Sequence, residues 1–134
     1  MSGKLMLFIA CISGASSVAL GAFGAHILKS MLTADQLNIY ETAVRYQFYH
    51  SLALLANGLL IVYAGQHANS MIWSTISAYA FIAGLLSFSG SLYLIIAMQY
   101  HQISTPWWIG MLTPLGGLCF ILGWISLAVA AWKI

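Results

Sequence analysis

Long apolar runs with almost no charge constrain this chain more than any other feature. Four of them cover residues 5–25, 43–64, 71–98 and 107–132. Each has at least the roughly 20 residues that a helix needs to cross the hydrocarbon core of a bilayer. Hydrophobic residues make up 62% of the sequence and charged residues only 4%, whereas a soluble domain needs several times more charge on its surface. The sequence therefore predicts a single all-α domain, a four-helix membrane bundle with both termini on the same side.

The few ionisable residues say more about orientation than about partners. The four Lys and Arg residues are scattered and form no basic patch, so no nucleic-acid partner is expected. With four spans, Lys4 and Lys133 share one side of the membrane, and Lys29 and Arg45 share the other. The positive-inside rule therefore finds two basic residues on each side and does not determine the orientation. The free amino terminus, and the use of Arg45 in a pair with Glu41, favour termini in the cytoplasm.

The amino-terminal run resembles a secretory signal because Lys4 precedes apolar and then small residues. The stretch from Leu5 to Ala25 is longer than the core of a signal peptide, so we expect a retained helix. Two cysteines, Cys11 and Cys119, lie in apolar runs without a CxxC partner. Buried, inert thiols are the expected interpretation of both.

Small residues recur at helical spacing in the first and third runs. In the first run they come every fourth position and continue to Ala25; in the third they follow the 3.6-residue period and include Ser77 and Ala80. Small side chains let helix backbones approach closely in lipid, where packing replaces the hydrophobic drive. The predicted helix-packing residues are Ser13, Ser17, Gly21, Gly84, Ser87 and Ser91.

The second run is preceded by a polar helix start. Thr33 is placed to cap a helix and Gln36 to complete a capping box. About three amphipathic turns follow, in which Glu41 and Arg45 stand at the favourable i, i+4 spacing. The pattern fits one long helix or two helices joined at a bend. Its amphipathic first part either lies at the membrane interface or projects from it.

A proline interrupts the fourth run. Pro114 either kinks a helix that begins at Trp107, or occupies the first turn of a helix capped by Thr113. Both arrangements leave enough residues to span, so the sequence does not decide between them.

Polar side chains gather where the first span ends and the second begins. They form one candidate binding cluster: His26, Glu41, Arg45, Tyr46, Tyr49, His50 and Asn57. Polar groups inside a membrane are costly enough that a function is the default hypothesis. With His26 and His50 expected at similar depth, the two imidazoles would approach each other or share Tyr46. The alternative interpretation is structural, namely hydrogen bonds that hold the helices in register.

No catalytic or metal-binding pattern is present. The sequence lacks GxSxG, HExxH, a phosphate-binding glycine loop and paired carboxylates, and two histidines without a third ligand are a weak metal signal. We therefore expect no reaction, cofactor or metal. Membrane lipid is one expected partner, and another copy or a second membrane protein is the other. The favoured function is that of a structural or accessory protein that packs with itself or a partner through its small-residue stripes. The alternative is an oligomeric binding or transport module for a lipid head group, small molecule or proton, using His26 and His50.

Four motifs occur together in order: residues 21–26 (GAFGAH), 46–55 (YQFYHSLALL), 88–93 (FSGSLY) and 113–117 (TPLGG). In this order and spacing the chain resembles the small membrane proteins of domain-of-unknown-function family 423, which includes the transmembrane protein 256 type. The resemblance covers nearly the whole chain. It implies a four-helix, multi-pass protein of the bacterial inner membrane, and it supplies no reaction and no catalytic residues.

Overall fold

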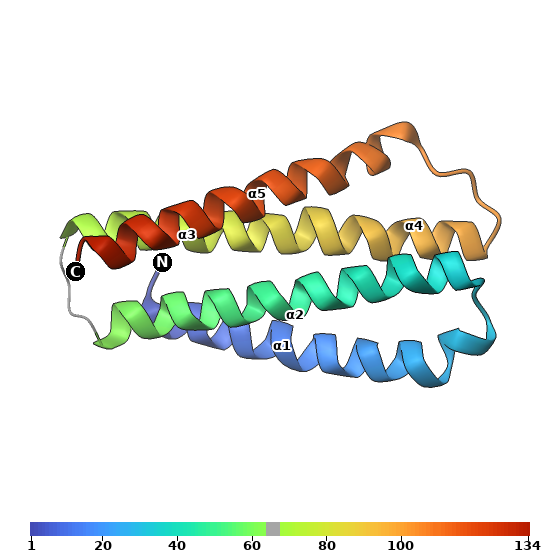
Figure 1. The fold of residues 1–134 in the computed structure, drawn as a ribbon, viewed down its shortest axis with the longest axis horizontal. Coiled ribbons are helices and arrows are strands. Elements are labelled where there is room, and N and C mark those ends of the chain that lie inside the picture. The colour runs from blue at the N-terminus through green and yellow to red at the C-terminus, as the bar shows by residue number, and fades with distance from the viewer. Residues whose placement is uncertain (64–67) are drawn as a thin grey trace.

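Helices account for nearly all of the chain in the computed structural model, which describes residues 1–63 and 68–134. In chain order the elements are α1 (Gly3–His26), η1 (Leu28–Ser30), α2 (Ala34–Tyr63), α3 (Ala68–Gly84), η2 (Leu85–Ser89), α4 (Gly90–Tyr100) and α5 (Trp107–Trp132). The single π-helical turn η2 joins α3 and α4 into one rod, so four rods lie side by side (Figure 1). Both termini lie at the same end of the bundle. The predicted all-α membrane bundle is confirmed.

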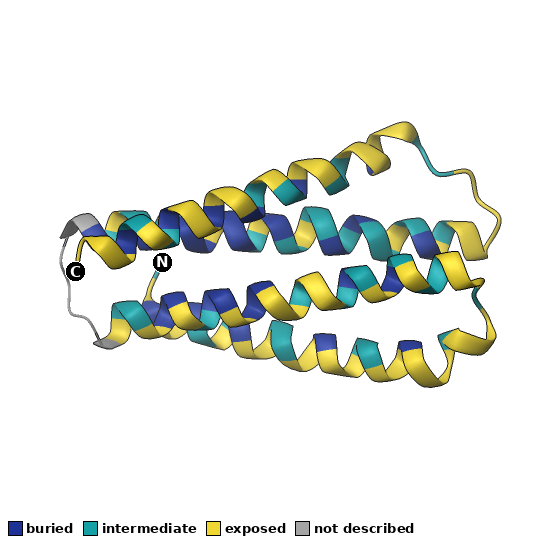
Figure 2. Ribbon diagram, in the orientation of Figure 1, coloured by how far each residue is buried: buried dark blue, intermediate teal, exposed yellow. Residues whose placement is uncertain are grey.

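The outside of the bundle is apolar, as lipid requires. Buried positions form inward-facing stripes along the helices (Figure 2). The exposed positions include large hydrophobic side chains on all four rods. Among the described residues, three segments are long and apolar enough to cross a membrane: Gly3–Ser30, Ser70–Tyr100 and Trp107–Trp132. The helix α2 is not one of them: its first turns are polar, and its apolar half contains Gln47, His50 and Asn57. It nevertheless runs along the whole of α1, so the division into four spans stays a prediction.

The bundle consists of two closely packed helix pairs. One pair is α1 with α2, the other is α3 and η2 with α5, and α2 makes most of the contacts between the pairs. The predicted small-residue stripes lie inside these pairs. On α1, the Ser13 hydroxyl accepts from Ser51 Oγ at 2.7 Å and Gly21 faces Val44. The stripe of α1 therefore packs against α2 of the same chain.

The stripe on the third span faces α5. Ser77 Oγ donates to the Gly123 carbonyl at 2.9 Å, and the hydroxyls of Ser91 and Thr113 share a hydrogen bond of 2.7 Å. Gly84 lies against the Phe120 ring, where a side chain has no room. Ser87 turns back to the Ala83 carbonyl of its own helix.

The start of α2 has the capping box that the sequence predicts. The Thr33 amide donates to Gln36 Oε1 at 3.0 Å, and the Gln36 amide donates to Thr33 Oγ1 at 3.3 Å. From Ala34 the helix continues unbroken to Tyr63, so one long helix forms rather than two. Its first turns lie along α1, because Tyr40 OH donates to the Leu20 carbonyl at 2.8 Å. Burial raises the Tyr40 pKa, which keeps the phenol protonated as a donor.

The structure also decides between the two predicted positions of Pro114. The helix α5 begins at Trp107 after the N-cap Pro106 and passes through Pro114 to Trp132. Pro114 is therefore inside a helix, and Thr113 bonds to Ser91 instead of capping. Figure 1 shows the first turns of α5 leaning away from α4. The expectation of two buried thiols is wrong for Cys11, which is exposed on α1, while Cys119 is half-buried.

Candidate functional site

His50 lies at the centre of an aromatic cluster. The residue is 6% exposed, and its ring stacks on Phe120 with centroids 3.4 Å apart and planes 8° from parallel. The rings of Tyr46, Phe81 and Trp124 complete its surroundings. Its Nδ1 lies 2.7 Å from the Tyr46 carbonyl. Because a carbonyl only accepts, Nδ1 carries the proton, and the ring orientation is fixed by its own helix.

Asn57 joins α2 to α3 in the dry interior. The side chain is fully buried, and its Nδ2 donates to the Ser74 carbonyl at 2.9 Å. The Ser74 hydroxyl donates in return to Asn57 Oδ1. This reciprocal pair is the helix-to-helix hydrogen bond of the structural interpretation.

His26 lies far from this cluster. It is exposed at the end of α1, where Nδ1 bonds to the Ala22 carbonyl at 2.9 Å. The antiparallel register places Gly24 beside Tyr40 and Ser13 beside Ser51, so His50 is level with about Gly14. His26 is 12 residues further along α1, or about 18 Å at 1.5 Å per residue. The two imidazoles do not approach each other, so that expectation is wrong. Tyr46 contacts His50 and does not link it to His26.

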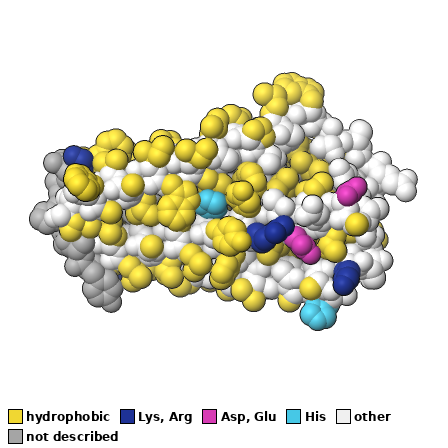
Figure 3. Space-filling view, viewed as in Figure 1, with side chains coloured by type: hydrophobic (Ala, Val, Ile, Leu, Met, Phe, Trp, Pro, Cys, Tyr) yellow, Lys and Arg dark blue, Asp and Glu magenta, His cyan; other side chains and the backbone are white. Residues whose placement is uncertain are grey.

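Three other predicted residues lie on the outer face of the α1–α2 pair. Arg45 Nε donates to the Glu41 main-chain carbonyl at 3.4 Å. Glu41 and Arg45 line an open cavity of about 250 Å³, and Arg45 and Tyr49 line an adjoining one of about 520 Å³. Acidic and basic side chains stand together on this face (Figure 3). The predicted residues thus occupy separate places: His50 and Asn57 are buried, while Tyr46 contacts His50 but is 39% exposed. The outer face carries Glu41, Arg45 and Tyr49, and His26 lies at the end of α1.

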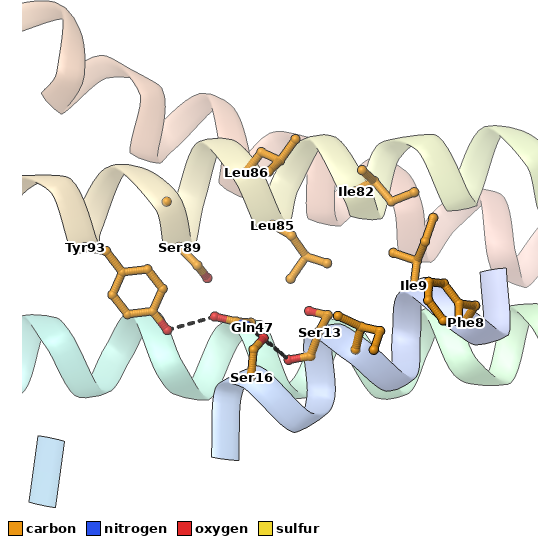
Figure 4. Close-up of a pocket in the computed structure, with 12 residues that line it drawn as sticks. Phe8, Ile9, Ser13, Ser16, Gln47, Ile82, Leu85, Leu86, Ser89 and Tyr93 are labelled. Carbon is orange, nitrogen blue, oxygen red and sulfur yellow. Dashed lines mark hydrogen bonds between the residues drawn. The ribbon is translucent and has the colours of Figure 1, made fainter. Parts of the chain in front are cut away.

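A further open cavity of about 400 Å³ separates the two helix pairs, and we call it the cleft. Its apolar walls come from α1 and from the α3–η2 rod (Figure 4). On its floor Gln47 Nε2 donates to the Ser13 carbonyl at 3.0 Å and to Ser16 Oγ at 2.8 Å. Tyr93 OH donates to Gln47 Oε1 at 2.8 Å. One glutamine thus connects α1, α2 and α4.

The π-helical turn η2 borders both the cleft and the aromatic cluster. Ser89 Oγ donates to the Ala43 carbonyl of α2 at 2.9 Å, and Phe88 stacks on Tyr46 with centroids 4.6 Å apart. On its other side Gly116 of α5 touches the Phe88 main chain. Such turns occur often at functional sites. Sequence reasoning missed η2 and the Gln47–Tyr93 link; a glutamine within an apolar run was the available signal for the latter.

The buried polar side chains of the interior bond to main-chain carbonyls or to one another. Within residues 1–63 and 68–134, no buried side-chain nitrogen or oxygen lacks a hydrogen-bond partner. Over the same residues, no group of three His, Cys, Asp or Glu side chains is placed to hold a metal ion. This arrangement fixes helices against one another.

Comparison with known proteins identifies a family without an assigned function. Residues 20–117 match the model of the protein family of unknown function DUF423, which confirms the resemblance drawn from the motifs. A UPF0382 membrane protein of Haemophilus influenzae is 38% identical over 99% of this chain and 97% of its own length. The UPF0382 inner membrane protein YgdD of Escherichia coli is 36% identical over 100% and 94%. A UPF0382 membrane protein of Staphylococcus aureus is 35% identical over 97% of both chains. No solved structure matches.

Proposed function

We propose that this protein, which belongs to the DUF423 family, is an accessory protein that packs with itself or with another membrane protein and performs no reaction of its own. It is a multi-pass membrane protein, and the Escherichia coli relative's name places it in the inner membrane. The observation that carries the proposal is the closed polar interior. Asn57 and Gln47 bond to neighbouring helices, and His50 Nδ1 bonds to the preceding turn of its own helix.

The cleft is the surface that we expect a partner helix to use. The small-residue stripes already face α2 and α5, so they are occupied within the chain. The cleft remains open between the helix pairs, and its rim carries exposed large side chains, including Phe8, Ile12 and Leu86. In lipid, close packing drives helix association, and a hollow with apolar walls gives an entering helix more contact than a convex face.

Cysteine crosslinking in native membranes tests this proposal. Cys11 and Cys119 are first replaced by Ala, and a single cysteine is placed on the cleft rim as Ile12→Cys or Leu86→Cys. Leu122→Cys, an exposed position on α5 outside the cleft, is the matched control. We expect a discrete crosslinked product from the rim cysteines and none from the control. Monomer alone at both rim positions would overturn the proposal.

The alternative, a proton or small-molecule module built on His26 and His50, is not favoured. The two rings lie about 18 Å apart along the bundle, and each bonds to a carbonyl of its own helix. His50 is also enclosed by aromatic rings. The pair therefore forms no common site.

We also propose that the termini face the cytoplasm. The support is the charge argument, since Arg45 stands one turn from the carboxylate-bearing Glu41, while Lys4 and Lys133 lie at the other end of the bundle. A reporter that fluoresces only in the cytoplasm, fused after Ile134, is expected to be bright. A dark fusion at normal expression would reverse the orientation.

A further inference from the structure

We propose that the outer face of the α1–α2 pair binds one phospholipid of the phosphatidylethanolamine class. This inference goes beyond the accessory role and does not depend on it. The two adjoining cavities described above share Gly21, Ala25, Val44 and Arg45. They therefore form one continuous hollow, which we call the outer groove.

The outer groove changes character along its length. Towards the end of the bundle that carries the α1–α2 connection, its lining includes Tyr40 and Glu41. Towards the middle of the membrane, the lining becomes Val18, Ala22 and Phe48. A phospholipid changes in the same direction, from a polar head group at the surface to an acyl chain inside. The exposed Tyr49 follows Phe48 and lines the inner part of the groove.

Two opposite charges stand in the order that this lipid presents. In the ethanolamine head group the phosphate is attached to the glycerol, and the ammonium lies further out. Arg45 is one helical turn deeper than Glu41, about 6 Å along the helix axis. The guanidinium is therefore placed for the phosphate, to which arginine bonds with favourable geometry. The Glu41 carboxylate is placed for the ammonium.

The two charged groups are also available. Arg45 uses Nε to reach the Glu41 main chain, and both side chains are exposed. In the part of the chain that the structure describes, the bond between these residues joins Nε to a main-chain oxygen, so it occupies neither the terminal nitrogens of Arg45 nor the Glu41 carboxylate. A phosphatidylglycerol head group would satisfy Arg45 but bring no cation to Glu41. The charge order therefore favours the ethanolamine lipid over the purely anionic one.

Native mass spectrometry of the full chain tests the site. The protein is incorporated into vesicles of equal phosphatidylethanolamine and phosphatidylglycerol, released gently, and its retained lipids are compared with the vesicle composition. We expect ethanolamine lipid to be enriched. Arg45→Gln is expected to lower retention of both lipids about fivefold, the factor that one basic residue contributes at a membrane surface. Glu41→Gln is expected to abolish the preference while lipid is still retained.

Two further variants separate the groove from charge in general. Ala22→Phe fills the hollow without changing any charge, because Ala22 is exposed and lines its inner part, and it should lower retention. Lys29→Gln removes a basic side chain at the same end of the bundle but outside the groove lining, and it should change nothing. Retained lipid that matches the vesicle composition, or that is unaffected by both Glu41→Gln and Ala22→Phe, would overturn the proposal. A helix docked there instead would appear as a second protein mass.

Discussion

The interior and the outer groove treat polar side chains in opposite ways. In the interior, Asn57 and Ser74 satisfy each other, and His50 is held by its own helix and by Phe120. On the outer groove, Glu41 and Arg45 stand exposed, and their one mutual bond uses the main chain. The buried polar side chains are thus hydrogen-bonded within the protein, whereas the charged groups on the outer groove face the surroundings.

The difference separates stability from binding. A buried polar group inside a membrane must find a partner within the protein, so its removal weakens the fold. An exposed charge near the membrane surface already meets water and lipid head groups, so its removal should leave the fold intact and change what the surface binds. The variants below are ordered by the size of their expected effect on stability, and each tests one side of this comparison.

The contact between α5 and η2 should be the most sensitive to substitution. A Cβ at Gly116 would collide with the Phe88 main chain, which has no freedom to move aside. We expect Gly116→Ala to lower the free energy of unfolding by about 3 kcal/mol, at the upper end for overpacking, as measured by unfolding in mixed micelles. Gly110→Ala, where nothing lies within 4 Å, is the control and should be neutral. Equal stability of the two variants would show that η2 is loosely held.

The Asn57–Ser74 pair should come second. Asn57→Ala removes two hydrogen bonds between α2 and α3 and is expected to lower the unfolding free energy by about 1–2 kcal/mol, the range for polar contacts between membrane helices. In a double-mutant cycle, Ser74→Ala should add little once Asn57 is replaced, because the two side chains serve each other. Full additivity of the two losses would contradict the closed arrangement.

The helices follow from the sequence because their signals are local. Run length predicts the long helices, and the Thr33–Gln36 capping box fixes where α2 begins. The faces of the stripes follow from helical period alone, although the sequence does not say that the stripe of α1 meets α2 and that of the third span meets α5.

The features that sequence reasoning missed depend on the register and packing of neighbouring helices. The polar residues near the α1–α2 connection appeared to share one depth, yet His50 lies 16 residues into α2, counting from Ala34. The register is set by close contacts such as Gly24 against Tyr40, which no local pattern reveals. The π-helical turn likewise depends on tertiary packing, because its Phe88 lies between Tyr46 and Gly116.

His50 itself should tolerate an aromatic replacement. Phenylalanine preserves the flat ring that stacks on Phe120 and gives up one bond to the Tyr46 carbonyl. His50→Phe is therefore expected to change the unfolding free energy by less than about 1.5 kcal/mol, as volume-conserving swaps do. His50→Ala, which also removes the ring, should be clearly worse. A large loss with Phe matching that with Ala would show that the imidazole nitrogens, rather than the ring, hold the site.

The smallest effect on stability is expected at the outer groove. Glu41→Gln and Arg45→Gln replace exposed side chains of α2, and each should leave the unfolding free energy within about 0.5 kcal/mol of the original, the usual range for surface substitutions. Their measurement in detergent without added phospholipid isolates the protein's own stability. In vesicles rich in phosphatidylethanolamine the same variants should lose the stabilisation that bound lipid gives the folded state. A deficit already present in detergent would place Glu41 and Arg45 with Asn57, as structural polar groups, and would erase the distinction between the two regions.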